Sequence, residues 1–350
     1  MHSRNRLAKF VVTVAAALML VVGTDARAES PSAGSVLIFP LFDSSPGSGT
    51  VICVTNTETD QSRCSDDTRG GDVSLHYVYY DGTTCREFDR YELLTPADTL
   101  CVLADEHNPE GEIGFLMVMA LNPVTNEPYQ FDHLVGQAIV VQSGLNFSWS
   151  YTPPSFRALA TPGGTACRRV NPDSTIGDGD GAADFNGAEY EAFPRELVVP
   201  TFFEEDDNFG NQLTVMSTAG DRYVNEVRYL IYNNIEDPYS RTQSFTCWFS
   251  TSLGEISQSA ANLNGDPDEL GHNTETGWVS VRGRTLRDQA GNPVRDDYDA
   301  VVVPPILGVF AQMIQGTDFA MGDSLYGRDG YTDGLELPHG NRDFDGEGSL

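Results

Sequence analysis

Hydrophobic residues recur along this chain in short runs separated by Gly, Pro, Asn and Asp. Branched and aromatic side chains dominate these runs, as in "GSVLIFPLF", "TVICVTNT" and "VSLHYVYY" of the first half and "ELVVPTFF", "QLTVMST" and "NEVRYLIY" of the second. Short runs of this composition between turn-forming residues predict β-strands. Long segments with the 3.6-residue period of an amphipathic helix are missing from the sequence. The pattern therefore predicts an all-β protein.

The order of the strand candidates repeats between the two halves. The matched segments are 39–42 with 199–202, 52–57 with 213–218, 75–81 with 227–233, and 114–120 with 277–283. Several matches in one order favour an internal duplication. We therefore predict two tandem antiparallel β-sandwich domains, Ig-like or jelly-roll-like. Chance similarity between unrelated β segments is the alternative.

The same pattern sets the expected domain boundaries. They are a signal peptide at 1–28, a first β-sandwich domain at 31–160, an acidic Gly/Asp-rich linker at 161–195, a second β-sandwich domain at 196–320 and a flexible acidic tail at 321–350.

The N-terminus predicts export. Arg4, Arg6 and Lys9 precede an apolar segment at 10–23, and the small residues Ala26 and Ala28 fit a cleavage site after residue 28. The apolar segment is shorter than the roughly 20 residues that a spanning helix needs. We expect a secretory signal peptide and a mature chain, without a membrane span, that is periplasmic, at the cell surface or secreted. An uncleaved membrane anchor is the alternative.

The charge balance is strongly acidic. The formal net charge is −30, and removal of residues 1–28 changes it to −33 because four basic residues and one acidic residue are lost. Such a charge opposes binding to nucleic acids and to anionic membranes. It suits divalent cations, basic partners or a saline medium, in which self-repulsion is screened.

The cysteine content predicts disulfides. Six cysteines in an exported chain are more typical of disulfides than of catalytic or zinc-binding thiols, and six allow 15 pairings. Strand alternation and the expected hairpin turn between Cys85 and Cys101 favour one set of disulfide pairings. The expected pairs are Cys53–Cys64, Cys85–Cys101 and Cys167–Cys247.

The stretch "TIGDGDGAADFNGAEYEAF" at 175–193 is the most specific local signal for a ligand, because its acidic residues are regularly spaced. Its candidate calcium ligands are Asp178, Asp180, Asp184, Asn186 and Glu189. They occupy positions 1, 3, 7, 9 and 12 of an EF-hand loop, although alanines stand at positions 5 and 6. The shorter pattern D-x-D-G-x-x-D resembles the calcium loops of thrombospondin type 3 repeats over about ten residues, and this resemblance implies calcium binding. A plain acidic linker between the domains is the alternative.

The sequence contains no G-x-S-x-G elbow, no H-E-x-x-H pair and no P-loop. Two acidic loops are candidates for acid–base chemistry: residues 103–114, which include His107, and the run at 204–207. We favour the interpretation of both as solvated loops, with a cation site as an alternative for the second. His76 alternates with Leu75 and Tyr77 and is expected to face solvent.

The aromatic residues at 147, 149 and 151 alternate and share one strand face. Such a face stacks on sugar rings or builds a core, and we favour the core. We expect an exported, non-enzymatic protein with a binding or structural role and a protein or glycan partner. The alternatives are a carbohydrate-binding protein that uses exposed aromatics and a glycan-cleaving hydrolase that uses loop carboxylates.

Overall fold

The computed structural model describes most of the chain after the predicted signal peptide. The described residues are 32–60, 71–108, 111–142, 147–159, 185, 187, 189–205, 209–233, 236–257, 276–296, 298–317 and 319–331. Those from Ala33 onward belong to one compact unit. The predicted signal peptide at 1–28 lies outside the described residues. None of the helices in the described ranges is long and apolar enough to cross a membrane.

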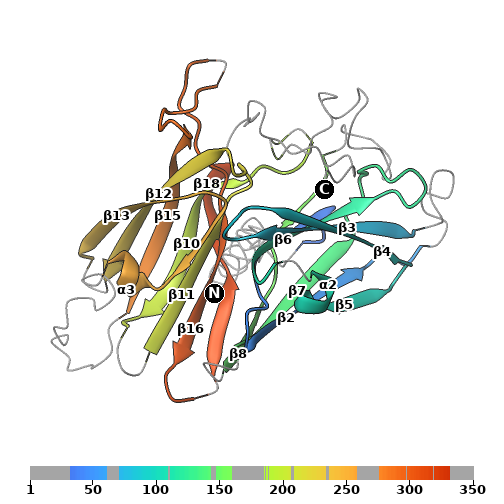
Figure 1. Cartoon of the computed structure of the whole chain (residues 1–350), viewed down its shortest axis with the longest axis horizontal. Coiled ribbons are helices and arrows are strands. Elements are labelled where there is room, and N and C mark those ends of the chain that lie inside the picture. The colour runs from blue at the N-terminus through green and yellow to red at the C-terminus, as the bar shows by residue number, and fades with distance from the viewer. Residues whose placement is uncertain are drawn as a thin grey trace, which may run out of the picture. The chain divides into compact units, whose positions relative to one another are not determined.

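The described chain is all-β, as predicted, and its strands form antiparallel sheets (Figure 1). The elements of the first half are β1 (Val36–Asp43), β2 (Ser48–Asn56), β3 (Val73–Asp81), β4 (Glu87–Leu94), β5 (Thr99–Leu103), α2 (Ala104–His107), β6 (Ile113–Leu121), β7 (Leu134–Gln142), β8 (Phe147–Tyr151) and β9 (Ser155–Phe156). Those of the second half are β10 (Pro194–Phe203), β11 (Phe209–Met216), β12 (Tyr223–Asn233), β13 (Pro238–Phe245), β14 (Trp248–Thr251), α3 (Leu253–Ile256), β15 (Thr276–Asp288), β16 (Leu307–Ile314), β17 (Ala320–Ser324) and β18 (Tyr326–Tyr331).

The strands form two five-stranded and two four-stranded sheets with matching connectivity. The five-stranded sheets have the orders β4-β3-β6-β1-β9 and β13-β12-β15-β10-β18, and the four-stranded sheets have the orders β5-β2-β7-β8 and β14-β11-β16-β17. The strand register matches as well. Phe39 pairs with Leu116 and Val199 with Val279, and each pairing is irregular just before Phe42 or Phe202. Segments that match in sequence therefore occupy matching positions in the two halves.

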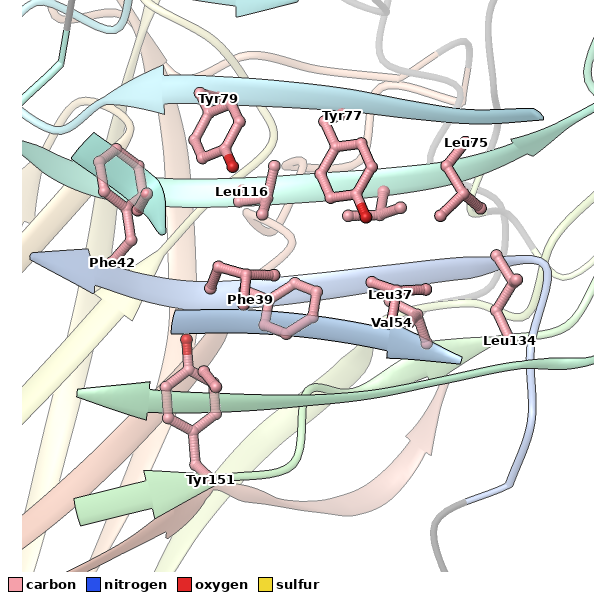
Figure 2. Close-up of a cluster of buried hydrophobic side chains, with 14 of the residues drawn as sticks. Leu37, Phe39, Phe42, Val54, Leu75, Tyr77, Tyr79, Leu116, Leu134 and Tyr151 are labelled. Carbon is pink, nitrogen blue, oxygen red and sulfur yellow. The ribbon is translucent and has the colours of Figure 1, made fainter. Parts of the chain in front are cut away.

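Each half buries one face of its five-stranded sheet and one face of its four-stranded sheet in a hydrophobic cluster. In the first half, Phe39 of β1 and Tyr77 of β3 lie in one cluster with Val54 of β2 (Figure 2). In the second half, Tyr229 of β12 and Leu213 of β11 share a cluster. This burial follows from strand alternation, which places every second side chain on the same face.

The first five-stranded sheet is also buried on its other face. All eight residues of β1 are buried, and Met117 and Met119 of β6 point to the same outer cluster as Val36. Met216 and Leu307 of the second half pack in that cluster. The two halves therefore share apolar packing, and the uninterrupted apolar runs of β1 and β6 reflect burial on both faces.

The segment expected to be a flexible tail begins with ordered strands. β17 pairs with β16, and β18 pairs with β10, so the prediction of a tail is wrong for residues 321–331. Edge strands are held by backbone hydrogen bonds, which a Gly- and Asp-rich sequence can still make. Residues 332–350 of the predicted tail lie outside the described part of the chain.

The two disulfides among the described residues are Cys53–Cys101 and Cys85–Cys247. All three predicted pairs are therefore wrong. Cys53 and Cys101 face each other directly in the β2–β5 register, with their Cα atoms 4.1 Å apart. β4 and β5, expected to form a hairpin, belong to different sheets, so Cys85 and Cys101 do not meet. Cys64 and Cys167 lie outside the described residues.

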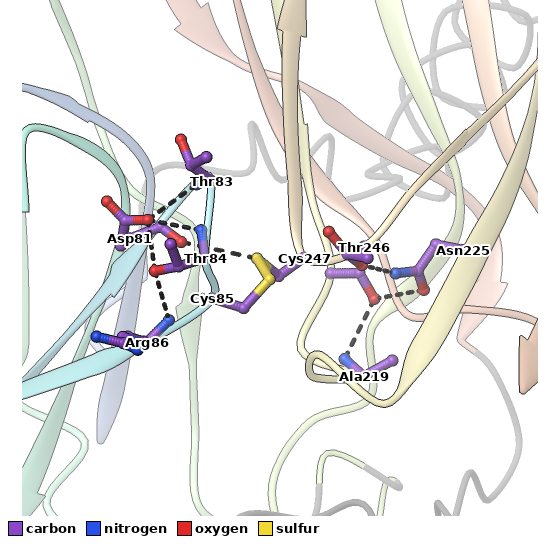
Figure 3. Close-up of a disulfide and its surroundings, with 10 residues drawn as sticks. Asp81, Thr83, Thr84, Cys85, Arg86, Ala219, Asn225, Thr246 and Cys247 are labelled. Atoms are coloured by element: carbon purple, nitrogen blue, oxygen red, sulfur yellow. Dashed lines mark hydrogen bonds between the residues drawn. A yellow bond between two sulfur atoms is a disulfide. The ribbon is translucent and has the colours of Figure 1, made fainter. Parts of the chain in front are cut away.

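The Cys85–Cys247 disulfide joins the two halves through two turns (Figure 3). Cys85 lies in the β3–β4 turn with a φ of 57°, and Cys247 lies between β13 and β14. The Asp81 carboxylate orders the first turn by accepting hydrogen bonds from the Thr84 backbone N–H at 2.6 Å and the Thr84 hydroxyl at 2.7 Å. Both cysteines are buried, so this covalent link lies inside the contact between the halves.

Replacement of Cys85 and Cys247 together by alanine is expected to lower the free energy of unfolding by about 2–5 kcal/mol. The bond closes a separation of 162 residues, whereas Cys53–Cys101 closes 48. Because the entropy of the unfolded chain depends on the length of the loop that a disulfide closes, loss of Cys85–Cys247 should lower the free energy of unfolding by about 1 kcal/mol more than loss of Cys53–Cys101. Urea unfolding of C85A/C247A and C53A/C101A measures the two effects. A smaller loss for C85A/C247A than for C53A/C101A would contradict this prediction.

Candidate functional site

A groove of about 520 Å³ lies where β17 of the second half runs beside β8 of the first. Ile139 of β7 and Phe319 and Met321 beside or within β17 supply apolar side chains, and Ser148 and Ser150 of β8 supply hydroxyls. All of the residues that line the groove are uncharged. Its volume falls within the range of roughly 300–1,000 Å³ that small-molecule sites occupy.

The register of β7 and β8 places the groove residues on one face. Ile139 pairs with Ser150 and Val141 with Ser148, whereas the alternating residues Ala138 and Val140 are buried in the first core. Strand alternation thus separates a core face from an exposed face in "GQAIVVQ".

Close packing between the halves completes the groove. A parallel bridge joins Ser148 to Phe319. A Cβ atom at Gly322 would lie 2.1 Å from the Trp149 ring, so the backbone of β17 packs directly on that indole and only glycine fits there. Both sides of the groove are therefore built by contacts between distant parts of the sequence.

The groove belongs to a wider uncharged surface with several exposed hydrophobic side chains, which we call the groove face. Among the described residues, ten large hydrophobic side chains are exposed, and five of them are on this face: Leu103, Ile139, Val141, Phe319 and Met321. The strand register continues the face across β5, β2 and β7, because Leu103 pairs with Val51 and Val51 with Ile139. Clusters of exposed hydrophobic side chains mark interaction sites in soluble proteins.

The aromatic run at 147–151 contributes to the core, as predicted, rather than to an exposed platform. Trp149 and Tyr151 are buried in the first cluster, and the Tyr151 hydroxyl donates a hydrogen bond to the carbonyl oxygen of Leu41. The Phe147 side chain lies outside the described residues. Trp149 also lines the groove.

The predicted calcium ligands are largely outside the described part of the chain. Asp178, Asp180, Asp184 and Asn186 all lie there. Glu189 is described and is buried, next to the bridge between Ala158 and Tyr190. Within the described ranges, the structure shows no group of three His, Cys, Asp or Glu side chains that could hold a metal ion.

The loop at 103–114 anchors a histidine against the core. His107 ends α2, and its Nδ1 atom lies 2.8 Å from the Tyr79 hydroxyl, while its ring stands edge-on to Tyr77 at 4.9 Å between centroids. The Glu92 carboxylate lies 3.5 Å from Nε2. Burial lowers the pKa of His107, and the neighbouring Glu92 partly opposes this. Asp105, from the same loop, is exposed.

Two further polar candidates have structural partners. The Glu205 carboxylate accepts a hydrogen bond from the Gly254 N–H at 2.7 Å, while Asp206 and Asp207 lie outside the described residues. His76 was expected to face solvent, and this is wrong, since it is only 3% exposed. It stacks on Tyr91, its cross-strand partner on β4, and its Nε2 atom lies 2.9 Å from the Asp89 carboxylate.

The His107→Gln variant tests the effect of burial on the histidine. A pKa below the ordinary value of about 6.5 means that the folded state binds fewer protons than the unfolded state, so stability is lost as the pH falls from about 6.5 through the folded pKa. The difference in unfolding free energy between wild type and His107→Gln should therefore shrink from pH 7.5 to pH 5. Urea titrations at both pH values measure it, and a difference independent of pH would contradict this prediction.

No protein-family model and no curated protein matches the chain. Among solved structures, it is similar to the crystal structure of Thermotoga maritima 1070, with 12% identity over 39% of this chain and 97% of that chain and a TM-score of 0.25. It is also similar to vicilin from Capsicum annuum, with 9% identity over 73% of this chain and 76% of that chain and a TM-score of 0.16. Similarity at these TM-scores supports no conclusion on fold or function.

Proposed function

We propose that this chain is an exported, non-enzymatic binding or structural protein built from two duplicated β-sandwich units, with the groove face as its binding surface. One observation carries the proposal. Among the described residues, half of the large hydrophobic side chains that are exposed lie on the groove face, around one uncharged groove. The lining of this groove is uncharged, whereas the chain as a whole has a net charge of −30.

The duplication is supported by the equal strand orders and the equal registers of the two halves. Export is supported by the predicted signal peptide and by the disulfides Cys53–Cys101 and Cys85–Cys247, since disulfides persist in oxidising compartments. The proposed location is the periplasm, the cell surface or the medium.

The chemistry of the groove favours an uncharged partner that offers both apolar surface and hydrogen-bonding groups. Phe319 and Met321 are 51% and 52% exposed, and burying such side chains contributes about 1.5–3 kcal/mol each. Ser148 and Ser150 provide hydroxyls that can orient a polar edge of the partner. The lining contains no carboxylate pair of the kind that glycoside hydrolysis requires, which is why binding rather than cleavage is proposed for the groove.

Calcium binding by the loop at 175–193 remains part of the proposal. It rests on the spacing of Asp178, Asp180, Asp184, Asn186 and Glu189 in the sequence. The loop joins the two halves, so a bound ion would order the junction between them.

The groove is tested with the neutral hydrophobic dye Nile red on the mature protein. The Phe319→Ser/Met321→Ser variant removes two exposed apolar side chains, so dye affinity should fall by about tenfold or more, given roughly 0.8 kcal/mol per methylene lost from contact. Fluorescence titration measures it. The matched control is Leu93→Ser, which changes an exposed residue on β4. Equal dye binding by wild type and the double variant would contradict the groove as a binding surface.

Calcium binding is tested by calorimetric titration of the mature protein. Heat of binding and a raised thermal midpoint are expected for the wild type, and both should be lost in Asp178→Asn/Asp180→Asn, because carboxylates at positions 1 and 3 supply ligand charge. The control is Asp343→Asn/Asp345→Asn, which removes the same charge from the C-terminal segment. A wild-type titration without heat or a thermal shift would remove calcium from the proposal.

A further inference from the structure

The outer face of the sheet β5-β2-β7-β8, to which the groove belongs, is free of charge. Strand alternation turns the odd-numbered residues of β5, β2 and β7 and the even-numbered residues of β8 away from the core. The residues between them, such as Ile52, Ala138 and Trp149, are buried in the first cluster. All of the outward-facing residues on these four described strands are uncharged. A protein with a net charge of −30 thus has one four-stranded face without a charged side chain.

The matching face of the second half is covered by the first half. It belongs to the sheet β14-β11-β16-β17. Val309 of β16 packs in the first core, and Met216 of β11 packs with Leu307 in the outer cluster of the first half. The Trp248 indole N–H of β14 donates a hydrogen bond to the carbonyl oxygen of Pro40 at 2.9 Å. In the second half this face therefore serves folding, whereas in the first half it is exposed.

The two matching faces differ in side-chain chemistry. Three positions have a large apolar side chain on the covered face and a hydroxyl or amide on the exposed face. With residues 52–57 matched to 213–218, the register gives the pairs Met216 and Thr55, Val309 and Gln137, and Trp248 and Thr99. Polar groups that stay unpaired in a dry contact cost free energy. The exposed face is therefore suited to a partner that itself offers hydrogen-bonding groups.

Three polar side chains of the groove are available for such a partner. Gln137, Ser148 and Ser150 line it and are exposed. Within the described part of the chain, their side chains make no hydrogen bond to another residue. A serine hydroxyl and a glutamine amide each both donate and accept. They can therefore bind the hydroxyl groups of a ligand in either direction.

The β17 side of the groove supplies the apolar contact. Phe319 and Met321 line it, and about half of each side chain is exposed. The face of an aromatic ring carries partial negative charge and attracts the polarised C–H groups of a ring packed on it. A ligand in the groove thus meets hydrogen-bonding groups from β7 and β8 and apolar groups from β17.

A disulfide on the same face stiffens it. Cys53 is the cross-strand partner of Gln137, and its bond to Cys101 ties β2 to β5. At the matching position of the covered face, Thr214 stands opposite Ser250 without a covalent link. A surface that is ordered before binding loses less conformational entropy when the ligand binds.

Taking the groove as the binding surface of the proposed function, we propose that its ligand is a neutral polysaccharide. A sugar ring has hydroxyl groups around its edge and C–H groups on its face. The hydroxyl groups hydrogen-bond to Gln137, Ser148 and Ser150, and the C–H groups pack on Phe319 and Met321. Acidic polymers find no cation on this face, and the net charge of the chain repels them. The open sheet surface lets a polymer extend past both ends of the groove.

The test uses the mature protein with four soluble neutral polymers as probes: β-1,3-glucan, β-mannan, galactan and dextran. Polygalacturonate is the acidic comparison. Affinity electrophoresis and calorimetry in 0.15 M NaCl should show binding to at least one neutral polymer and none to polygalacturonate. Since the contact contains no ion pair, affinity should change by less than about twofold between 0.15 and 1 M NaCl.

The Ser148→Ala/Ser150→Ala variant separates the polysaccharide from a merely apolar ligand. It should weaken polysaccharide binding about tenfold, because two uncharged hydrogen bonds are lost, and leave Nile red affinity unchanged. Phe319→Ser/Met321→Ser should lower both affinities. The matched control is Ser240→Ala/Ser244→Ala, which removes two hydroxyls from exposed positions of the edge strand β13 and should change neither.

Three results would overturn the proposal: binding to none of the neutral polymers, equal binding to polygalacturonate, or an equal loss in the two serine variants. Dimerisation of the wild type that is lost in Phe319→Ser/Met321→Ser, measured by sedimentation, would also overturn it, because the face would then belong to a second copy. Failure of the proposed function is a separate result, namely equal Nile red binding by the wild type and Phe319→Ser/Met321→Ser.

Discussion

The packing of the second half against the outer face of the first five-stranded sheet is the constraint on which the rest of the structure depends. It explains why β1 is buried along its whole length. It also explains why the apolar residues Met117 and Met119 stand on a sheet face that would otherwise contact water. Burial of each such side chain contributes about 1.5–3 kcal/mol. The halves therefore stabilise each other although their strand orders are the same, and the Cys85–Cys247 bond fixes the contact covalently.

This one-sided packing gives two similar scaffolds different surfaces. The first half uses its outer sheet face for folding, whereas the matching face of the second half holds Arg228 and Arg282 in contact with solvent. The packing also brings β17 beside β8, so the groove exists only where the two halves meet. The groove is thus a product of the contact between the halves, and the exposed outer face of the second sheet follows from the asymmetry of that contact.

Local sequence patterns predicted the strands and the core face of residues 147–151, because alternation and turn residues act within a few positions. They failed where the outcome depends on distant partners. The burial of His76 depends on what covers its sheet, and the Cys53–Cys101 bond depends on β5 joining β2 rather than β4. The groove was missed because Phe319 lies far in sequence from Ile139. The alternation in "GQAIVVQ" was a usable signal, since Ile139 and Val141 had to face away from the core.

The acidic composition and the exposed groove face are physically connected. An apolar surface that includes Phe319 and Met321 normally invites self-association. Copies of a chain with a net charge of −30 repel one another, and this repulsion opposes pairing of two groove faces while leaving an uncharged partner unaffected. The lining of the groove is itself uncharged, so the repulsion comes from charges elsewhere on the two molecules and not from residues at the contact between two groove faces. The charge excess thus favours uncharged partners over copies of the chain, and screening by salt weakens that preference.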